Sequence, residues 1–255
     1  MKHWYTLAAA LSIVACSSKT DDASGTAGSS GAGGTGNGGT GGASASGGGP
    51  AVSCTAEPEH TGEGTYYDAD GSGNCSFDPS PDDLMVGAMN EIDYAGSVVC
   101  GACAHIDGPN GAVDVRVVDR CPECPQGDID LSPQAFEQIA PLVQGRVPIR
   151  WRFQDCNVSG PIRFRFKEGS NQWWTAVQIR NHRNRVAKLE YDDGSTFREV
   201  ARETYNYFVA ASGMGPGPYR FRVTDVYGNQ LVEEGIEHRE AEEVPGTGQF
   251  PACTR

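Results

Sequence analysis

Apolar and polar residues alternate along several short segments in the middle of the chain. The clearest alternation has Val113, Val115 and Val117 separated by Asp114 and Arg116. A period of two is typical of a strand with one buried face. Shorter β runs separated by turns occur at 64–68, 96–106 and 146–153. This part of the chain therefore predicts a compact, mostly β barrel with one or two helices.

One helix is predicted in this region, after residue 132. Ser132 is a residue type that caps helices, and Pro133 suits the first helical position. The apolar positions that follow have the spacing of one helix face: Ala135, Phe136, Ile139 and Ala140.

The strands become longer after a boundary near residues 156–160. They are predicted at 161–169, 173–182, 185–191, 205–211 and 219–234. Turn residues at 192–194 and 227–229 suit hairpins. The second half therefore predicts a β-sandwich.

The N-terminus predicts export. Residues 1–16 contain one Lys followed by an uncharged stretch, Trp4 to Val14, that is too short for a permanent membrane span. The end of this segment, Leu11 to Cys16, resembles the bacterial lipoprotein cleavage box. We therefore expect Cys16 to be lipidated and the protein to be anchored at the cell surface or outer membrane. An ordinary signal peptide and a secreted protein are the alternative.

Residues 17–53 predict a disordered tether. They contain thirteen glycines with Ser, Thr and Ala, and almost no large apolar side chain. Such a segment cannot offset the entropy of folding.

Eight further cysteines follow Cys16, and an even number in an exported chain indicates disulfides. Two Cys-x-x-Cys pairs, at 100–103 and 121–124, are also spaced for a zinc ribbon. Export favours disulfides, so we expect no metal and no cofactor. The count alone allows 105 pairings.

Negative charge is concentrated in the first half of the folded chain. Residues 55–156 contain 5 Lys and Arg against 18 Asp and Glu, while residues 157–255 contain 13 of each. Like charges repel, so nucleic acid and anionic polymers are poor partners for the first half.

Several motifs make the chain resemble a bacterial expansin over residues 60–235. They are GTYYDADGSGNCSF, CGACAHIDGPNG, VVDRCPECPQGDIDLSPQAF, IRWRFQDC and KEGSNQWWTAVQIRNH. The resemblance implies a six-stranded double-psi β-barrel, similar to glycoside hydrolase family 45, over residues 54–157. An Ig-like β-sandwich that binds cellulose would follow over residues 158–255.

The resemblance also implies residue roles. Thr65, Asp119 and Asp130 would form the polar groove of the barrel. Trp173, Trp174 and Tyr205 would form the aromatic platform of the sandwich. It further implies that Cys75 pairs with Cys100 and Cys103 with Cys156, which leaves Cys121 with Cys124 and Cys54 with Cys253. The chain departs from the family at Cys121, where some bacterial members have a Tyr, and in its acidity.

Glycoside hydrolysis needs a carboxylic acid and a second carboxylate facing it across the sugar. Asp130 is the candidate acid, and Asp119 is its expected neighbour rather than its partner. Asp68 or Asp70 would be the missing base. Strand alternation places Thr65 and Tyr67 on one face, so Asp68 should point away.

Neighbouring residues of a regular strand also face opposite sides, so one of Trp173 and Trp174 should be buried unless the strand bulges or twists. Three exposed rings together would stack on alternate glucoses of a flat chain.

We therefore expect a monomeric protein that binds and loosens cellulose or a related β-glucan without hydrolysis. Two alternatives remain open. One is a glucan hydrolase that uses Asp130 with Asp68 or Asp70. The other is a peptidoglycan lytic transglycosylase resembling rare lipoprotein A. Xyloglucan and peptidoglycan are the alternative polymers.

Overall fold

The computed structural model describes residues 52–254, and side chains from residue 54 onward. The predicted signal peptide, Cys16 and most of the predicted tether lie outside these residues. No helix within residues 52–254 is long and apolar enough to cross a membrane.

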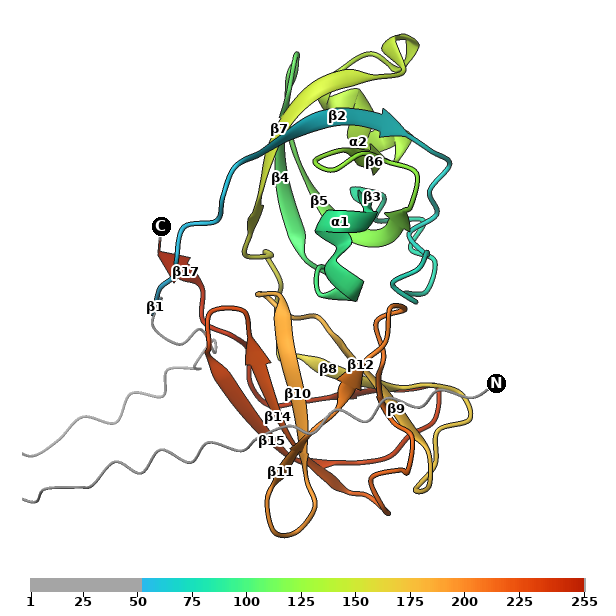
Figure 1. Cartoon of the computed structure of the whole chain (residues 1–255), viewed down its shortest axis with the longest axis vertical. Coiled ribbons are helices and arrows are strands. Elements are labelled where there is room, and N and C mark those ends of the chain that lie inside the picture. The colour runs from blue at the N-terminus through green and yellow to red at the C-terminus, as the bar shows by residue number, and fades with distance from the viewer. Residues whose placement is uncertain (1–51, 255) are drawn as a thin grey trace, which may run out of the picture. The chain divides into compact units, whose positions relative to one another are not determined.

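Six strands close into a barrel in the order β2-β6-β3-β5-β4-β7 (Figure 1). Two of the contacts are parallel, β2 with β6 and β3 with β5, and the others are antiparallel. The strands are β2 (His60–Tyr66), β3 (Val86–Asn90), β4 (Cys103–Gly108), β5 (Gly111–Cys121), β6 (Ile129–Leu131) and β7 (Val147–Gln154). The predicted six-stranded barrel is confirmed.

Alternation determines which side chains fill the barrel. On β5, Val113, Val115 and Val117 are buried, and on β7 so are Val147, Ile149, Trp151 and Phe153. Trp151 is 1% exposed, and its indole nitrogen donates to the carbonyl of Gly127 at 2.7 Å. The largest side chain of this core therefore also satisfies its polar atom.

The predicted helix is present as α2 (Pro133–Ile139). The Ser132 hydroxyl accepts a hydrogen bond from the backbone N–H of Ala135 at 3.0 Å, and Ala135, Phe136 and Ile139 are buried. The prediction of a strand at 96–106 was partly wrong. That segment begins in a 3-10 helix, η1 (Ala95–Ser97), after the one-turn helix α1 (Glu91–Tyr94), and only β4 is extended. Left-handed backbone at Gly96 and Gly101 makes this turn possible.

The second half of the described chain forms two sheets. One has the order β11-β10-β14-β15 and the other β12-β13-β9-β8-β16 (Figure 1). Phenylalanines dominate the core between them: Phe164, Phe166, Phe208, Phe221 and Phe250. The strands are β8 (Arg163–Phe166), β9 (Thr175–Arg180), β10 (Val186–Asp192), β11 (Phe197–Glu199), β12 (Ala201–Arg202), β13 (Phe208–Ala210), β14 (Tyr219–Asp225), β15 (Gln230–Ile236) and β16 (Glu243–Pro245).

The first described residues are attached to the C-terminal end of the folded chain and do not form part of a tether. β1 (Val52–Ser53) pairs in parallel with β17 (Cys253–Thr254), and Cys54 forms a disulfide with Cys253. The Glu57 carboxylate accepts hydrogen bonds from Arg185 at 2.5 Å and from the Tyr227 hydroxyl at 2.6 Å. The tether predicted up to residue 53 is therefore too long at its end, because two of its residues are hydrogen-bonded into a strand. Residues 52–57 are called the N-terminal strap below.

The other disulfides join Cys75 to Cys100, Cys103 to Cys156 and Cys121 to Cys124. This pairing is the one that the resemblance to expansins implies. Both Cys-x-x-Cys pairs are used in disulfides, so their cysteines offer no thiolate to a zinc ion.

Barrel and sandwich are joined by hydrogen bonds from the loop that follows β2. The Ser76 hydroxyl donates to the carbonyl of Tyr205 at 2.9 Å, and the Cys75 carbonyl accepts from Gln178 at 2.7 Å. Next to this loop, the Tyr94 hydroxyl donates to the carbonyl of Thr204 at 2.8 Å, and the side-chain amide of Asn74 donates to the same carbonyl at 2.8 Å. Backbone groups of both parts are therefore paired across the junction.

Candidate functional site

Parallel pairing of β2 and β6 brings Thr65 opposite Asp130. The Thr65 hydroxyl donates a hydrogen bond to Oδ1 of Asp130. The two residues are 65 positions apart in sequence, so only the closed barrel brings them together. The predicted association of Thr65 with Asp130 is therefore present in the fold.

Burial raises the pKa of the Asp130 carboxyl above its usual value. The negative charges of Glu123 and Asp119 act in the same direction, while the hydrogen bond from Thr65 and the positive charge of Arg146 oppose it. Desolvation favours the neutral acid, and a donor such as Thr65 favours the carboxylate. Asp130 is thus a half-buried carboxyl group whose neutral form is favoured relative to that of an exposed aspartate.

Asp119 has a different role from Asp130, because its carboxylate is hydrogen-bonded to backbone N–H groups. Its Oδ1 accepts from the backbone N–H of Asn74 at 2.6 Å and of Arg120 at 2.8 Å. Gly73 approaches so closely that a Cβ there would lie 2.4 Å from Cγ of Asp119. Asp119 therefore holds the loop after β2 against the end of β5, which fits the expected supporting neighbour of Asp130.

Tyr67 is a residue of this site that sequence reasoning missed. Its hydroxyl is buried and, among the described residues, has no hydrogen-bond partner. Burial raises the pKa of Tyr67, and the negative charges of Asp119, Asp130 and Asp70 raise it further. The phenol therefore lies among these carboxylates. The signal was available in the alternation that places Thr65 and Tyr67 on one face.

The two candidate bases of the hydrolase alternative are exposed. Asp70 accepts hydrogen bonds from the backbone N–H and the hydroxyl of Ser72, at 2.8 and 2.6 Å, and these bonds lower its pKa. It is a turn carboxylate that organises its own loop. Asp68 is also exposed, on the residue after Tyr67.

Cys121 is the groove position at which the chain departs from the expansin motif. It forms a disulfide with Cys124, three residues further along the chain, and is 5% exposed. The loop that it closes carries Glu123, whose charge acts on Asp130. A half-buried disulfide and an exposed carboxylate thus lie at the position where the resemblance implies a Tyr in some bacterial members.

The two adjacent tryptophans lie in a turn before β9, not on the strand. Trp173 is 72% exposed and Trp174 is partly exposed. Oδ1 of Asn171 accepts the backbone N–H groups of Trp173 and Trp174 at 2.9 and 3.2 Å. Neither ring is buried as regular strand alternation would require, because the turn that Asn171 closes interrupts the alternation.

A glycine of a neighbouring loop supports this turn. Gly213 has φ +75°, and a Cβ there would lie 2.0 Å from the carbonyl oxygen of Gln172. No other residue fits this approach, so Gly213 lets the loop 211–215 pack beneath the tryptophan turn.

Tyr205 lies in the turn between β12 and β13 and is partly exposed. Its carbonyl accepts from Ser76, whose loop also supplies the Asn74 N–H that holds Asp119. Residues 74–76 therefore touch both the carboxylate site of the barrel and the Tyr205 turn of the sandwich. Between β13 and β9 the register pairs Ala210 with Thr175, the residue after Trp174.

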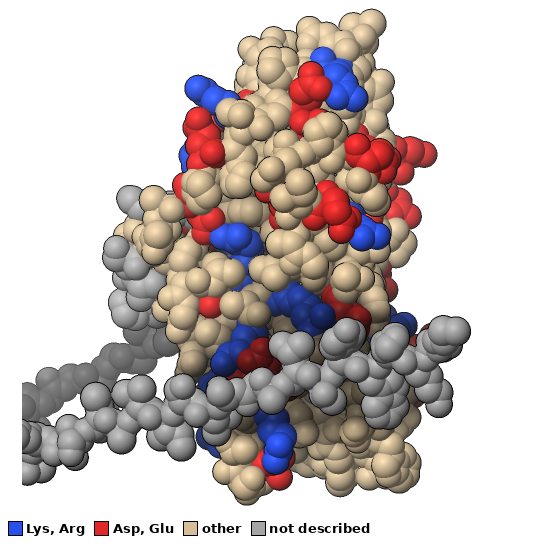
Figure 2. All heavy atoms as spheres, viewed as in Figure 1, with Lys and Arg blue, Asp and Glu red and all other residues tan. Residues whose placement is uncertain are grey.

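The barrel side of the molecule is acidic. In Figure 2 acidic side chains are scattered over the barrel, in agreement with the charge of residues 55–156. Among the described residues, no group of three or more His, Cys, Asp or Glu side chains could hold a metal ion.

Comparison with known proteins shows which families and proteins this chain is similar to. A family model described as lytic transglycolase matches residues 87–151. Expansin-YoaJ of Bacillus subtilis is 35% identical over 214 residues, which cover 79% of this chain and 91% of that protein. Expansin-like protein 2 of Dictyostelium discoideum is 30% identical over 204 residues, 74% of this chain and 50% of that protein.

Solved structures extend the similarity to the fold. The apo form of the Clavibacter michiganensis expansin is 31% identical, with a TM-score of 0.72 over 76% of this chain and 99% of that one. A mutant of the same expansin in complex with cellohexaose matches equally well. With its closed barrel, its second β domain and a relative matched over nearly its whole length, the chain belongs to the expansin family.

Proposed function

We propose that this protein binds cellulose or a related neutral β-glucan and loosens the polymer network without cutting it. The observation that carries the proposal is the state of Asp130, a half-buried acid with a raised pKa and one hydroxyl partner, Thr65. Such a group can exchange its hydrogen bond with Thr65 for one with a sugar hydroxyl. That exchange would hold or displace a glucan chain.

The surroundings of Asp130 support a role without hydrolysis. Activation of water needs a second free carboxylate facing the acid. Asp119 is held by two backbone N–H groups and Asp70 by Ser72, while Asp68 is exposed. These carboxylates are therefore poorly prepared to act as a base.

Binding of the polymer is assigned to Trp173, Trp174 and Tyr205. An aromatic side chain that remains 72% exposed, as Trp173 does, offers apolar area that a sugar ring can cover. The relative crystallised with cellohexaose supports a β-glucan as the ligand class. The negative charge of residues 55–156 disfavours acidic polymers.

Attachment to a membrane surface through a lipid on Cys16 completes the proposal. It rests on the sequence from Leu11 to Cys16 and on the glycine-rich segment behind it.

Hydrolysis is a second candidate because of Glu123. This carboxylate is close enough for its charge to raise the pKa of Asp130, and it is exposed in the loop closed by Cys121 and Cys124. It could serve as the base that Asp68 and Asp70 are badly placed to provide.

One experiment separates the candidates. The protein is incubated with cellulose, xyloglucan and purified peptidoglycan, and bound protein and released reducing ends are measured together. Binding to cellulose without release of reducing ends supports the proposal. Release that is lost in both Asp130→Asn and Glu123→Gln establishes a hydrolase, and release of sugars from peptidoglycan alone establishes a lytic transglycosylase.

A further inference from the structure

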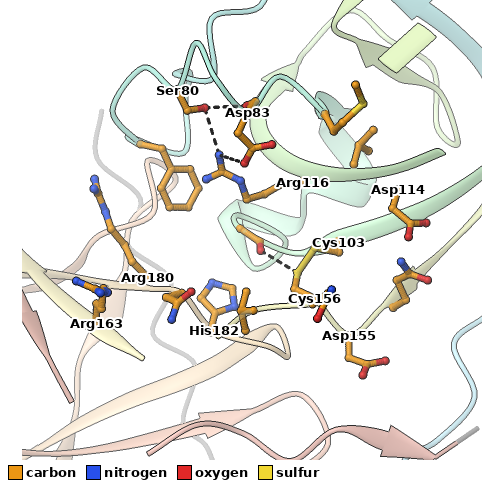
Figure 3. Close-up of a pocket in the computed structure, with 18 of the residues that line it drawn as sticks. Ser80, Asp83, Cys103, Asp114, Arg116, Asp155, Cys156, Arg163, Arg180 and His182 are labelled. Atoms are coloured by element: carbon orange, nitrogen blue, oxygen red, sulfur yellow. Dashed lines mark hydrogen bonds and ion pairs between the residues drawn. A yellow bond between two sulfur atoms is a disulfide. The ribbon is translucent and has the colours of Figure 1, made fainter. Parts of the chain in front are cut away.

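A cavity of ≈ 640 Å³ lies where residues of the barrel and of the sandwich meet (Figure 3). Its volume falls in the range of small-molecule sites, which are common at domain junctions. The residues that line it do not include Thr65, Asp119 or Asp130 of the barrel groove, or any residue of the aromatic platform. The function proposed above therefore leaves this cavity without a role.

Arg116 is the less exposed of two arginines in this cavity that make no short hydrogen bond, the other being Arg163, and its guanidinium lies over the Phe77 ring at 5.3 Å from the centroid. Its closest polar contacts are the Ser80 hydroxyl at 3.4 Å and the Asp83 carboxylate at 3.6 Å. Both are long for a charge-assisted hydrogen bond, which is normally 2.7–2.9 Å. Burial lowers the pKa of Arg116, with Asp83 opposing this effect. The guanidinium thus retains donors that a ligand can use.

Arg180, on the opposite wall, differs from Arg116 because its guanidinium makes several short hydrogen bonds. Its guanidinium donates to Asp78 at 2.7 Å, to Glu243 at 2.9 Å and to the carbonyl of Ser76 at 3.0 Å. It is a structural residue whose donors are occupied. Figure 3 shows Arg116, Ser80 and Asp83 together on one side of the cavity, facing Arg180, Arg163 and His182 on the other.

The chemistry of Arg116 and Asp83 suits two neighbouring hydroxyl groups. A guanidinium only donates hydrogen bonds and a carboxylate only accepts them, while a hydroxyl does both. One hydroxyl can accept from Arg116 while its neighbour donates to Asp83. Vicinal hydroxyls of this kind are found on every unsubstituted hexose or pentose ring.

The charges and the apolar residues of the lining restrict the class of ligand further. Five carboxylates line the cavity against three guanidinium groups. His182 is neutral near pH 7 because burial lowers its pKa to about 4. The excess of negative charge disfavours phosphates and uronates. Met85, Val115 and Val158 also line the cavity and can contact the C–H groups of a sugar ring.

We propose that this cavity is a second saccharide site, which binds a short neutral oligosaccharide through a vicinal diol held by Arg116 and Asp83. The site is separate from the aromatic platform and does not depend on cellulose binding there. A chain end or a side branch of a cell-wall glycan would have the required size and chemistry.

The test uses the full chain with the platform removed by W173A, W174A and Y205A. Cellotriose and a xyloglucan heptasaccharide are titrated into this variant by calorimetry, with trigalacturonate as the anionic comparison. We expect saturable binding of at least one neutral sugar and none of trigalacturonate. Adding Asp83→Asn should weaken that binding about tenfold, since the hydroxyl would then donate to a neutral amide oxygen instead of a charged carboxylate.

Two further variants control for indirect effects. Val158→Trp should fill the cavity and abolish binding without altering any charge. Asp82→Asn removes an exposed neighbouring carboxylate outside the cavity and should leave binding unchanged. Circular dichroism and thermal unfolding establish that each variant is folded.

Three results would overturn the proposal: no heat with either neutral sugar, binding that survives both Asp83→Asn and Val158→Trp, or equal affinity for trigalacturonate. Cellulose sedimentation by the wild type is measured in parallel. Because that binding is assigned to the platform, a failure of the cavity site can be distinguished from a failure of the proposed function.

Discussion

The hydroxyl of Thr65 donates to the carboxylate of Asp130 across two parallel strands that are far apart in the sequence. The hydrogen bond from this neutral side chain lowers the pKa of Asp130 and so opposes the effect of burial. Most of the functional expectations for the barrel depend on it.

Replacing Asp130 by Asn should remove wall loosening and preserve polymer binding. The amide loses the hydrogen bond of a charged group to a sugar, which is worth about 1.5–3 kcal/mol. Creep of isolated plant cell walls, or weakening of filter paper, should fall strongly, while sedimentation with cellulose should be unchanged. Asp68→Asn is the matched control. If both variants loosen walls as the wild type does, Asp130 has no part in loosening.

Replacing Thr65 by Val should raise the pKa of Asp130 further, because the hydrogen bond that favours the carboxylate is lost. A titration followed by carboxyl ¹³C chemical shift should show the Asp130 transition moving to higher pH. The Asp70 transition, which is governed by Ser72, serves as the internal reference. An Asp130 transition that does not move would show that Thr65 does not stabilise the ionised form.

Removing Trp173, Trp174 and Tyr205 together should abolish sedimentation with cellulose at low and at high salt. Stacking depends on apolar area, and residues 157–255 carry no net charge to attract a polymer. Val232→Ala is the control, since Val232 is an exposed apolar residue of the same domain at 45% exposure. Binding that disappears only at high salt would point to an electrostatic site instead.

His182 should make the protein less stable in mild acid. Burial, assisted by the charge of Arg202, lowers the pKa of His182 from 6.5 to about 4. Between these values the unfolded chain binds a proton that the folded protein excludes, so stability falls as the pH drops from about 6.5 to 4. The loss approaches about 1.4 kcal/mol per pH unit within this window.

Urea unfolding at several pH values measures this slope. His182→Gln should flatten it between pH 4 and 6.5 and leave it unchanged above pH 7. A variant with the same slope as the wild type would assign the acid sensitivity to carboxylates.

Cys16 should carry a lipid after export. Expression with radioactive palmitate should label the wild type but not Cys16→Ser, and the variant should be released into the soluble fraction. Labelling that persists in Cys16→Ser would refute the anchor.

Local patterns were sufficient for those elements whose stabilising contacts lie nearby in the sequence. The valine alternation of β5 and the Ser132 cap of α2 are examples, because a strand face and a helix cap each depend on a few neighbouring residues. Local patterns could not decide whether Trp173 and Trp174 lie on a regular strand or at an interruption of it. Their exposure depends on the turn closed by Asn171 and on Gly213, which lies about forty residues further along the chain.

The site itself was predictable only through resemblance. Nothing in the sequence near Thr65 indicates that Asp130 is its partner, since barrel closure brings them together. The cavity at the junction was not predictable, because its walls come from distant segments such as Asp83, Arg116 and Val158. Glu123 was missed for the same reason, because its charge acts on Asp130 only in the folded barrel.

The N-terminal strap determines how mechanical force travels through the molecule. Tension applied to the chain before Cys54 passes through the bond to Cys253 directly into the sandwich, and the contacts of Glu57 with Arg185 and Tyr227 reinforce this route. The barrel belongs to a covalently closed loop and lies outside that route. A pull between the N-terminus and the sandwich is therefore carried by the sandwich and by the Cys54–Cys253 bond, and it bypasses the barrel.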